Sequence, residues 1–221
     1  MKKALRDNGL SIVLFTLFTL AIIGHGWAGW LSENEDRLRD GLSELPLAGY
    51  LASGSFISSV FENWESEFLQ MGCYVCLTAY LFQRGSPESK NPDKPAPQDR
   101  DPALDAGKAD APWPVRAGGM ARMLYSHSLG IALFLLFVAS FVLHLSGSAA
   151  DAAEEAILAG EAPPTILEHL GSASFWFESF QNWQSEFLST AVLIVLAIFL
   201  RERGSPESKP VSAPHGETGN D

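Results

Sequence analysis

The sequence has little positive charge, few cysteines and no local catalytic motif. Its 221 residues include 15 Lys and Arg against 26 Asp and Glu, which gives a formal net charge of −11. A basic patch able to bind nucleic acid is absent, so we exclude nucleic-acid partners. No HExxH motif of a zinc hydrolase occurs, and the two cysteines form a single C-x-x-C. The four longest apolar blocks contain no Lys, Arg, Asp or Glu.

Those four blocks predict an all-α integral membrane protein, and they occupy 9–30, 68–82, 129–145 and 187–200. A helix needs roughly 20 residues to cross about 30 Å of hydrocarbon. The second and fourth blocks reach this length only with neighbouring residues. We therefore predict four transmembrane helices at 9–30, 64–83, 125–146 and 183–201. A cleaved signal peptide is the alternative for the first block, but the block is long and no Ala-x-Ala site follows it.

The distribution of charge predicts the orientation of these helices. Of the 15 basic residues, 13 lie before the first block, between the second and third, or after the fourth. Positive loops stay on the cytoplasmic side, so we expect a multi-pass plasma-membrane protein with both termini in the cytoplasm. The segments on the other side hold 15 of the 26 acidic residues.

The chain reads as a tandem duplication with an offset of 119 residues. Between 61–90 and 180–209, 16 of 30 positions are identical, and the offset also places His25 on His144. Parallel repeats of this kind predict two helical hairpins related by an axis along the membrane normal. We expect short amphipathic helices at 46–64 and 163–183 on the outer leaflet. The predicted divisions are repeat 1 at 1–90, a disordered cytoplasmic linker at 91–119, repeat 2 at 120–209 and a disordered tail at 210–221.

Both repeats place Asn-Trp-x-Ser-Glu at the outer mouth of an apolar block. Trp64 and Trp183 suit the interfacial aromatic belt. The other shared polar residues form a candidate polar cluster at similar depth: Asn63, Asn182, Glu67, Glu186, His25 and His144. One interpretation is interfacial anchoring, since a carboxylate is favoured in the first turn of a helix. The alternative is a buried site that relays protons or binds a divalent metal such as Zn²⁺.

Two further motifs permit a structural or a functional interpretation. RGSPESK follows each inward-going helix, where Arg84 and Arg203 suit both the helix dipole and the lipid headgroups. It is either an anchoring stop with a turn or a docking surface for a cytoplasmic partner. Cys73 and Cys76 lie near the middle of a predicted span, where Cys behaves as a small hydrophobe. A thiol oxidoreductase is the alternative.

The NWxSEFL and RGSPESK elements on a four-span acidic chain resemble a family of small bacterial membrane proteins of unknown function. The resemblance implies a bacterial plasma-membrane location and no particular activity. We expect a non-enzymatic structural or interaction protein without a cofactor. Its partners would be the lipid bilayer and a second copy or another membrane protein. A small proton-linked transporter or channel, and a thiol or metal enzyme, are the alternatives.

Overall fold

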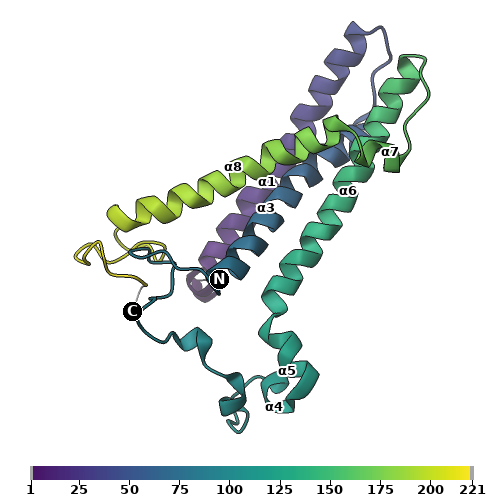
Figure 1. Ribbon diagram of the computed structural model, residues 1–221. Coiled ribbons are helices and arrows are strands. Elements are labelled where there is room, and N and C mark those ends of the chain that lie inside the picture. The colour runs from purple at the N-terminus through teal and green to yellow at the C-terminus, as the bar shows by residue number, and fades with distance from the viewer. Residues whose placement is uncertain (1, 220–221) are drawn as a thin grey trace. The chain divides into compact units, whose positions relative to one another are not determined.

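The structure is a computed structural model that describes residues 2–219, whose regular elements are all helices, with no strand among these residues (Figure 1). The predicted all-α fold class is confirmed for these residues. Four helices are long, namely α1 (Lys2–Arg39), α3 (Gly54–Thr78), α6 (Ser128–Leu158) and α8 (Ala173–Phe199). The shorter elements are α2 (Leu47–Tyr50), η1 (Pro97–Asp99), η2 (Pro102–Asp105), α4 (Trp113–Ala117), α5 (Gly119–Ser126) and α7 (Ile166–Leu170).

Three of the long helices are long and apolar enough to cross a membrane: Leu5–Arg39, Ser128–Leu158 and Ala173–Phe199. In the most apolar 18-residue stretch of each helix, only 6%, 11% and 6% of the residues are buried within the protein. Side chains such as Leu10 and Phe15 are 75% and 70% exposed, so hydrocarbon is the solvent that suits them. The protein is therefore membrane-embedded.

Helix α3, the predicted second span, is not among these three. It ends at Thr78, short of the predicted end at 83, and its first half carries Glu62, Glu65 and Glu67. Any long window inside α3 therefore includes several carboxylates. The four-span topology and the repeat hairpins stay predictions.

The outer segments differ from the separate amphipathic helices predicted at 46–64 and 163–183. Only the short helices α2 and α7 stand apart, and after a turn of two or three residues the rest of each segment belongs to α3 or α8. The cause is local, because no Pro interrupts either stretch after the Gly and Ser residues near 53–55 and 171–174. Backbone hydrogen bonds consequently run on without a break into the apolar part of each long helix.

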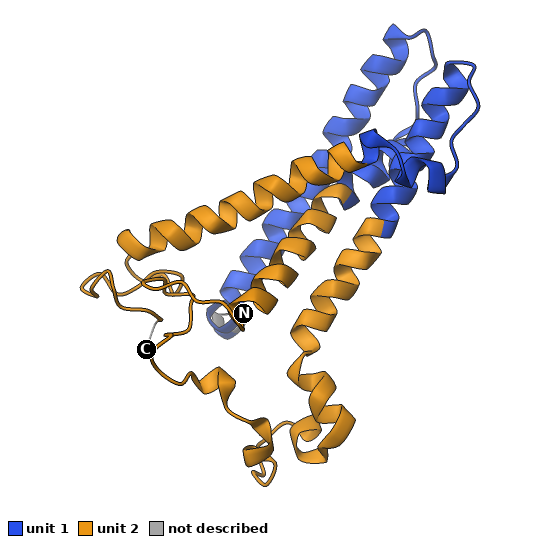
Figure 2. Ribbon diagram, viewed as in Figure 1, with its two compact units in different colours: residues 1–61, 142–175 blue, residues 62–141, 176–221 orange. Residues whose placement is uncertain are grey.

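The chain divides into two compact units, and each contains parts of both sequence repeats (Figure 2). Unit 1 comprises 1–61 and 142–175, and unit 2 comprises 62–141 and 176–221. In unit 1, α3 and α6 approach closely at two glycines. A Cβ on Gly54 would lie 2.6 Å from the Gly147 carbonyl oxygen, and one on Gly147 would lie 2.9 Å from that of Gly54. Small residues permit such backbone contact between membrane helices.

The end of α1 in unit 1 is held by polar contacts. Trp30 Nε1 and Asn34 Nδ2 donate to the Leu45 carbonyl oxygen at 2.7 and 3.1 Å. Arg37 forms an ion pair with Glu154 of α6 at 3.1 Å. These contacts carry α1 past its predicted end at 30 and fix the loop that follows it.

The predicted linker and tail consist largely of turns. The segment 91–119 holds η1, η2 and α4, and the tail bonds to other parts of unit 2 through residues 213–219. The disorder predicted for both segments stays a prediction.

Candidate functional site

Three rings meet in the first repeat, within unit 1. The Phe56 ring centroid lies 5.4 Å from that of His25 and 5.3 Å from that of Tyr50. His25 Nε2 is also 3.2 Å from the Ser59 hydroxyl, one turn along α3. These elements come together because α2 turns the chain back toward α1 before α3 begins. We call His25, Tyr50 and Phe56 the first ring cluster.

Three rings meet in the same way in the second repeat, also within unit 1. The fully buried Phe175 ring lies 4.9 Å from His144 and 5.8 Å from His169. His169 Nε2 is 2.8 Å from the hydroxyl of Ser148, and both of these side chains are buried. We call His144, His169 and Phe175 the second ring cluster.

The members of the two ring clusters correspond one to one at the offset of 119. His25 corresponds to His144, Phe56 to Phe175, and Tyr50 to His169. Tyr50 and His169 were not predicted from the sequence because their residue types differ, although the offset of 119 relates the two positions. An aromatic contact of this kind contributes about 0.5–1.5 kcal/mol, so each cluster fastens helices to each other.

The candidate polar cluster is divided between the two units. Its two histidines belong to unit 1 and are used in the ring clusters, whereas its Glu and Asn residues belong to unit 2. Glu67 and Asn63 are exposed on α3, and Glu186 and Asn182 are half-buried on α8. Within residues 2–219, no group of three or more His, Cys, Asp or Glu could hold a metal ion. A single site formed by all these residues stays a prediction.

Carboxylates outside the candidate polar cluster, those of Glu62 and Glu65, accept hydrogen bonds from Asn182 and Trp183 within unit 2. Trp183 Nε1 donates to Glu65 Oε1 at 2.8 Å, and Glu65 is fully buried. Asn182 Nδ2 donates to a Glu62 carboxylate oxygen. The second repeat carries Gln181 and Gln184 in place of these two glutamates. Glu62 and Glu65 were not predicted as site residues, and this difference between the repeats was the available signal.

Trp183, one of the predicted interfacial anchors, is also part of an aromatic group in unit 2. Its ring lies 5.3 Å from Phe180, 6.2 Å from Trp176 and 6.4 Å from Phe137. Both Trp183 and Trp64 are half-buried. The Trp183 ring therefore packs α8 against Phe137 of α6. Its indole N–H donates a hydrogen bond at the same time, as buried indoles usually do.

The two cysteines are free thiols on α3. They line an apolar cavity of about 190 Å³ together with residues such as Phe68 and Phe137. This environment suits cysteine as a small apolar residue.

The two RGSPESK copies fold into the same turn, and we call residues 84–90 the first heptapeptide turn and 203–209 the second. Gly85 and Gly204 have φ angles of 90° and 91°, which L side chains rarely adopt. Each turn has the same four hydrogen bonds, with donor–acceptor distances that agree within about 0.1 Å. In the first turn they are Ser86 N–H to Gln83 O, Gln83 N–H to Ser89 Oγ, Glu88 N–H to Ser86 Oγ, and Ser89 Oγ–H to Lys90 O.

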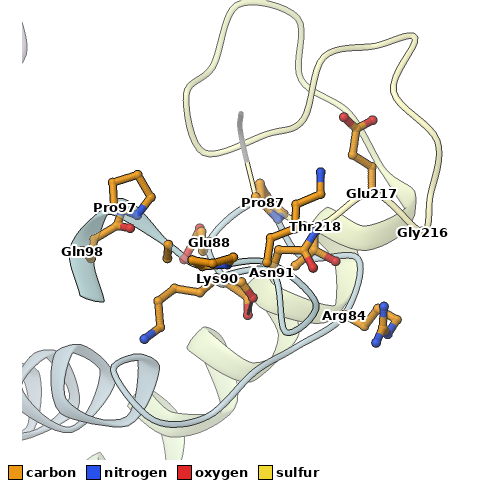
Figure 3. A pocket seen from close by; sticks show the side chains of 15 residues that line it. Arg84, Pro87, Glu88, Lys90, Asn91, Pro97, Gln98, Gly216, Glu217 and Thr218 are labelled. Carbon is orange, nitrogen blue, oxygen red and sulfur yellow. Dashed lines mark hydrogen bonds between the residues drawn. The ribbon is translucent and has the colours of Figure 1, made fainter. Parts of the chain in front are cut away.

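A cavity lined by many polar side chains lies beside the first heptapeptide turn (Figure 3). The cavity measures about 570 Å³ and is lined by residues of the turn, of the linker and of the tail. Arg84, a predicted anchor, forms an ion pair with Asp93 at 2.6 Å. Glu88 accepts a hydrogen bond from Tyr74. Burial raises the pKa of Glu88, as does the nearby carboxylate of Glu207, its counterpart in the second turn, and these effects outweigh the lowering by Tyr74.

The chain belongs to the family described as "Domain of unknown function (DUF6766)", whose model matches residues 1–220. No curated protein and no solved structure matches it. Family membership therefore agrees with the resemblance at the coarse level of an uncharacterised family, and it assigns no activity to either ring cluster or to the heptapeptide turns.

Proposed function

We propose that this member of the family is a four-span protein of the bacterial plasma membrane with a structural or interaction role and no enzymatic activity. Three helices suited to a bilayer and the one-sided basic residues support this arrangement. In this arrangement α3 crosses the membrane in addition to those three helices. The two repeats form parallel hairpins, and both termini lie in the cytoplasm.

The observation that carries the proposal is that side chains shared by the two repeats form contacts between helices. His25 and His144 each lie against the Phe of their own repeat, and Trp183 donates to the buried Glu65. These groups are engaged in contacts between helices, which is the arrangement expected of structural residues. Buried polar groups in membrane proteins contribute to helix association through such hydrogen bonds.

A labelling experiment tests the topology. In a Cys73→Ser, Cys76→Ser background, single cysteines are introduced as Glu161→Cys and Gly216→Cys, both at exposed positions. A membrane-impermeant maleimide should label the first in intact cells and the second only after permeabilisation. Labelling of Gly216→Cys in intact cells would contradict the proposed orientation.

A flux experiment separates this role from a proton-linked transporter or channel. Glu67 and Glu186 are replaced together by Gln, and pH-dependent flux is measured in vesicles, with the exposed cytoplasmic Glu202→Gln as the matched control. A structural role predicts no flux in the parent protein. Flux in the parent that disappears in the Glu67, Glu186 variant, with folding unchanged, would instead identify a transporter.

The thiol or metal enzyme is tested separately. Metal analysis of the purified protein and the phenotype of the Cys73→Ser, Cys76→Ser variant are compared with those of the parent. We expect no bound transition metal and an unaltered phenotype. Stoichiometric metal, or loss of the phenotype on removing both thiols, would favour the enzyme.

A further inference from the structure

Two short helices, α4 and α5, lie directly before α6 within unit 2 (Figure 1). The chain turns between them at Gly118 and Gly119, whose φ angles of 71° and 54° favour glycine. Helix α4 packs against α5, and Val115 of α4 is buried. The two short helices therefore support each other.

Helix α5 has an apolar face that the rest of the chain leaves largely uncovered. Met120, Met123 and Leu124 follow the spacing i, i+3, i+4, which places them on one side of a helix. All three are more than half exposed, at 68%, 53% and 51%. Trp113, the first residue of α4, is 67% exposed as well. Exposed apolar side chains that gather in this way mark an interaction surface.

The position of α5 in the chain ties this face to the bilayer. Only His127 separates α5 from α6, which is one of the three helices suited to a membrane. The apolar stretch of α6 begins at Leu129. Helix α5 is about 12 Å long at 1.5 Å per residue, so all of it lies within reach of the headgroup layer. The covalent link to α6 also gives α5 a high effective concentration at that surface.

The charges of this region fit an anionic lipid surface. Residues 111–150 contain no Asp or Glu, although the chain has a net charge of −11, and their only Lys or Arg residues are Arg116 and Arg122. Neither guanidinium forms an ion pair with any residue of 2–219. Four basic residues between 84 and 108 do form one: Arg84 with Asp93, Lys90 with Asp99, and both Arg100 and Lys108 with Asp105. Lipid phosphates can supply the missing negative charge.

The arrangement of charge around α5 is that of a helix lying in the membrane surface. Arg122 is about 200° from Met120 around the helix, so it lies on the polar side. Helices of this kind bury their apolar side at the boundary between headgroups and acyl chains and carry basic residues on the other side. An indole such as that of Trp113 is favoured in the same layer.

We propose that α4 and α5 form an interfacial anchor, whose apolar face lies in the cytoplasmic leaflet and whose two arginines attract anionic phospholipids. The arginines stay at the level of the headgroups, where the surface potential of anionic lipids acts on them. Assignment to the cytoplasmic leaflet rests on the proposed topology, and the lipid surface as partner goes beyond it. A second copy of the chain is the alternative occupant of the apolar face, and the experiment separates the two.

Fluorescence quenching tests the anchor in the full-length protein reconstituted in vesicles. In a Cys73→Ser, Cys76→Ser background, a single cysteine is introduced as Met123→Cys on the apolar face or as Tyr125→Cys, its matched control, and is labelled with bimane. The two exposed positions are two residues apart and point about 200° away from each other. A spin-labelled lipid should quench the probe at 123 more than the probe at 125. Aqueous iodide, present on both sides of the membrane, should do the reverse.

Lipid composition tests the role of the arginines. In vesicles that contain phosphatidylglycerol, Arg116→Gln and Arg122→Gln together should lower the ratio of lipid-bound to free α5 by up to about 25-fold, at about five-fold for each charge near an anionic surface. The two fluorescence lifetimes of the probe at 123 measure this ratio. In vesicles of phosphatidylcholine alone, the same substitutions should change it little. Arg84→Gln with Arg100→Gln removes two arginines that are already ion-paired, and this matched control should leave the ratio unchanged.

Three results would overturn the proposal. If iodide quenches the probe at 123 at least as well as the probe at 125, α5 extends α6 into water. If the probe at 123 is shielded from both quenchers, protein covers the apolar face, and dependence on the protein-to-lipid ratio identifies a second copy. If the Arg116, Arg122 pair has no larger effect than the control pair, the arginines do not attract the lipids. Both leaflets have the same composition, so these results do not depend on orientation, and maleimide labelling reports failure of the proposed topology separately.

Discussion

Replacement of Phe175 by Ala should destabilise the protein more than replacement of any exposed aromatic residue of α8. Phe175 is fully buried in unit 1, with the rings of His144 and His169 at 4.9 and 5.8 Å. Alanine would leave both rings without their common partner. The expected effect is a loss of contact between α8 and the two elements that carry these histidines, α6 and α7.

The magnitude follows from the size of the cavity and the lost ring contacts. Removing a phenyl group opens about 100 Å³, which costs about 2 kcal/mol of unfolding free energy at about 24 cal/mol per Å³. Two aromatic contacts add about 0.5–1.5 kcal/mol each. Because an unfolded membrane helix still buries its side chains in lipid, we add nothing for transfer from water, and we expect a total of about 3–5 kcal/mol.

The assay is reversible unfolding in mixed detergent micelles, followed by Trp fluorescence. Phe177→Ala is the matched control, since Phe177 lies on the same helix and is 69% exposed. Phe56→Ala, in the first ring cluster, should lie between the two because Phe56 is only half-buried. If Phe175→Ala and Phe177→Ala lower the unfolding free energy equally, the ring clusters do not fasten the helices and the reasoning fails.

Three further predictions concern polar groups. Glu65→Ala leaves the Trp183 indole without its acceptor and should cost about 1–3 kcal/mol in the same unfolding assay, whereas Glu67→Ala should cost little. Thr165→Ala removes the capping box of α7 and should cost about 0.5–2 kcal/mol, seen as faster hydrogen exchange of α7 alone. The raised pKa of Glu88 means that its contribution to stability is full below the ordinary value of 4.5 and is lost as the pH rises through the raised pKa. Stability of the Glu88→Gln variant should not show this decline.

Much of the fold could be predicted because hydropathy is a local property. Three of the four predicted spans coincide with long apolar helices, although α1 and α6 extend beyond the predicted ends at 30 and 146. Those extensions depend on contacts such as the Arg37–Glu154 ion pair between residues far apart in sequence. Hydropathy carries no information on such pairs.

The candidate site could be predicted only in part. The offset of 119 identified His25 and His144, and both lie in ring clusters, but Tyr50 and His169 were missed because the search followed identical residues. Glu67, which is exposed, was predicted as a site residue, whereas the fully buried Glu65 was not. Residues two positions apart point about 200° away from each other on a helix, so the orientation of α3 decides between them.

The sequence by itself determined that this protein is helical, that it enters a membrane and that it carries one motif set twice, because apolar composition and internal identity need no knowledge of packing. Only the tertiary structure decided what each copy does. RGSPESK folds into the same turn in two places, but Gly85 of the first copy donates a hydrogen bond to Thr218 of the tail, whereas Lys209 of the second copy donates to tail carbonyl oxygens. Identical segments acquire different neighbours, since contacts between distant residues depend on the path of the whole chain.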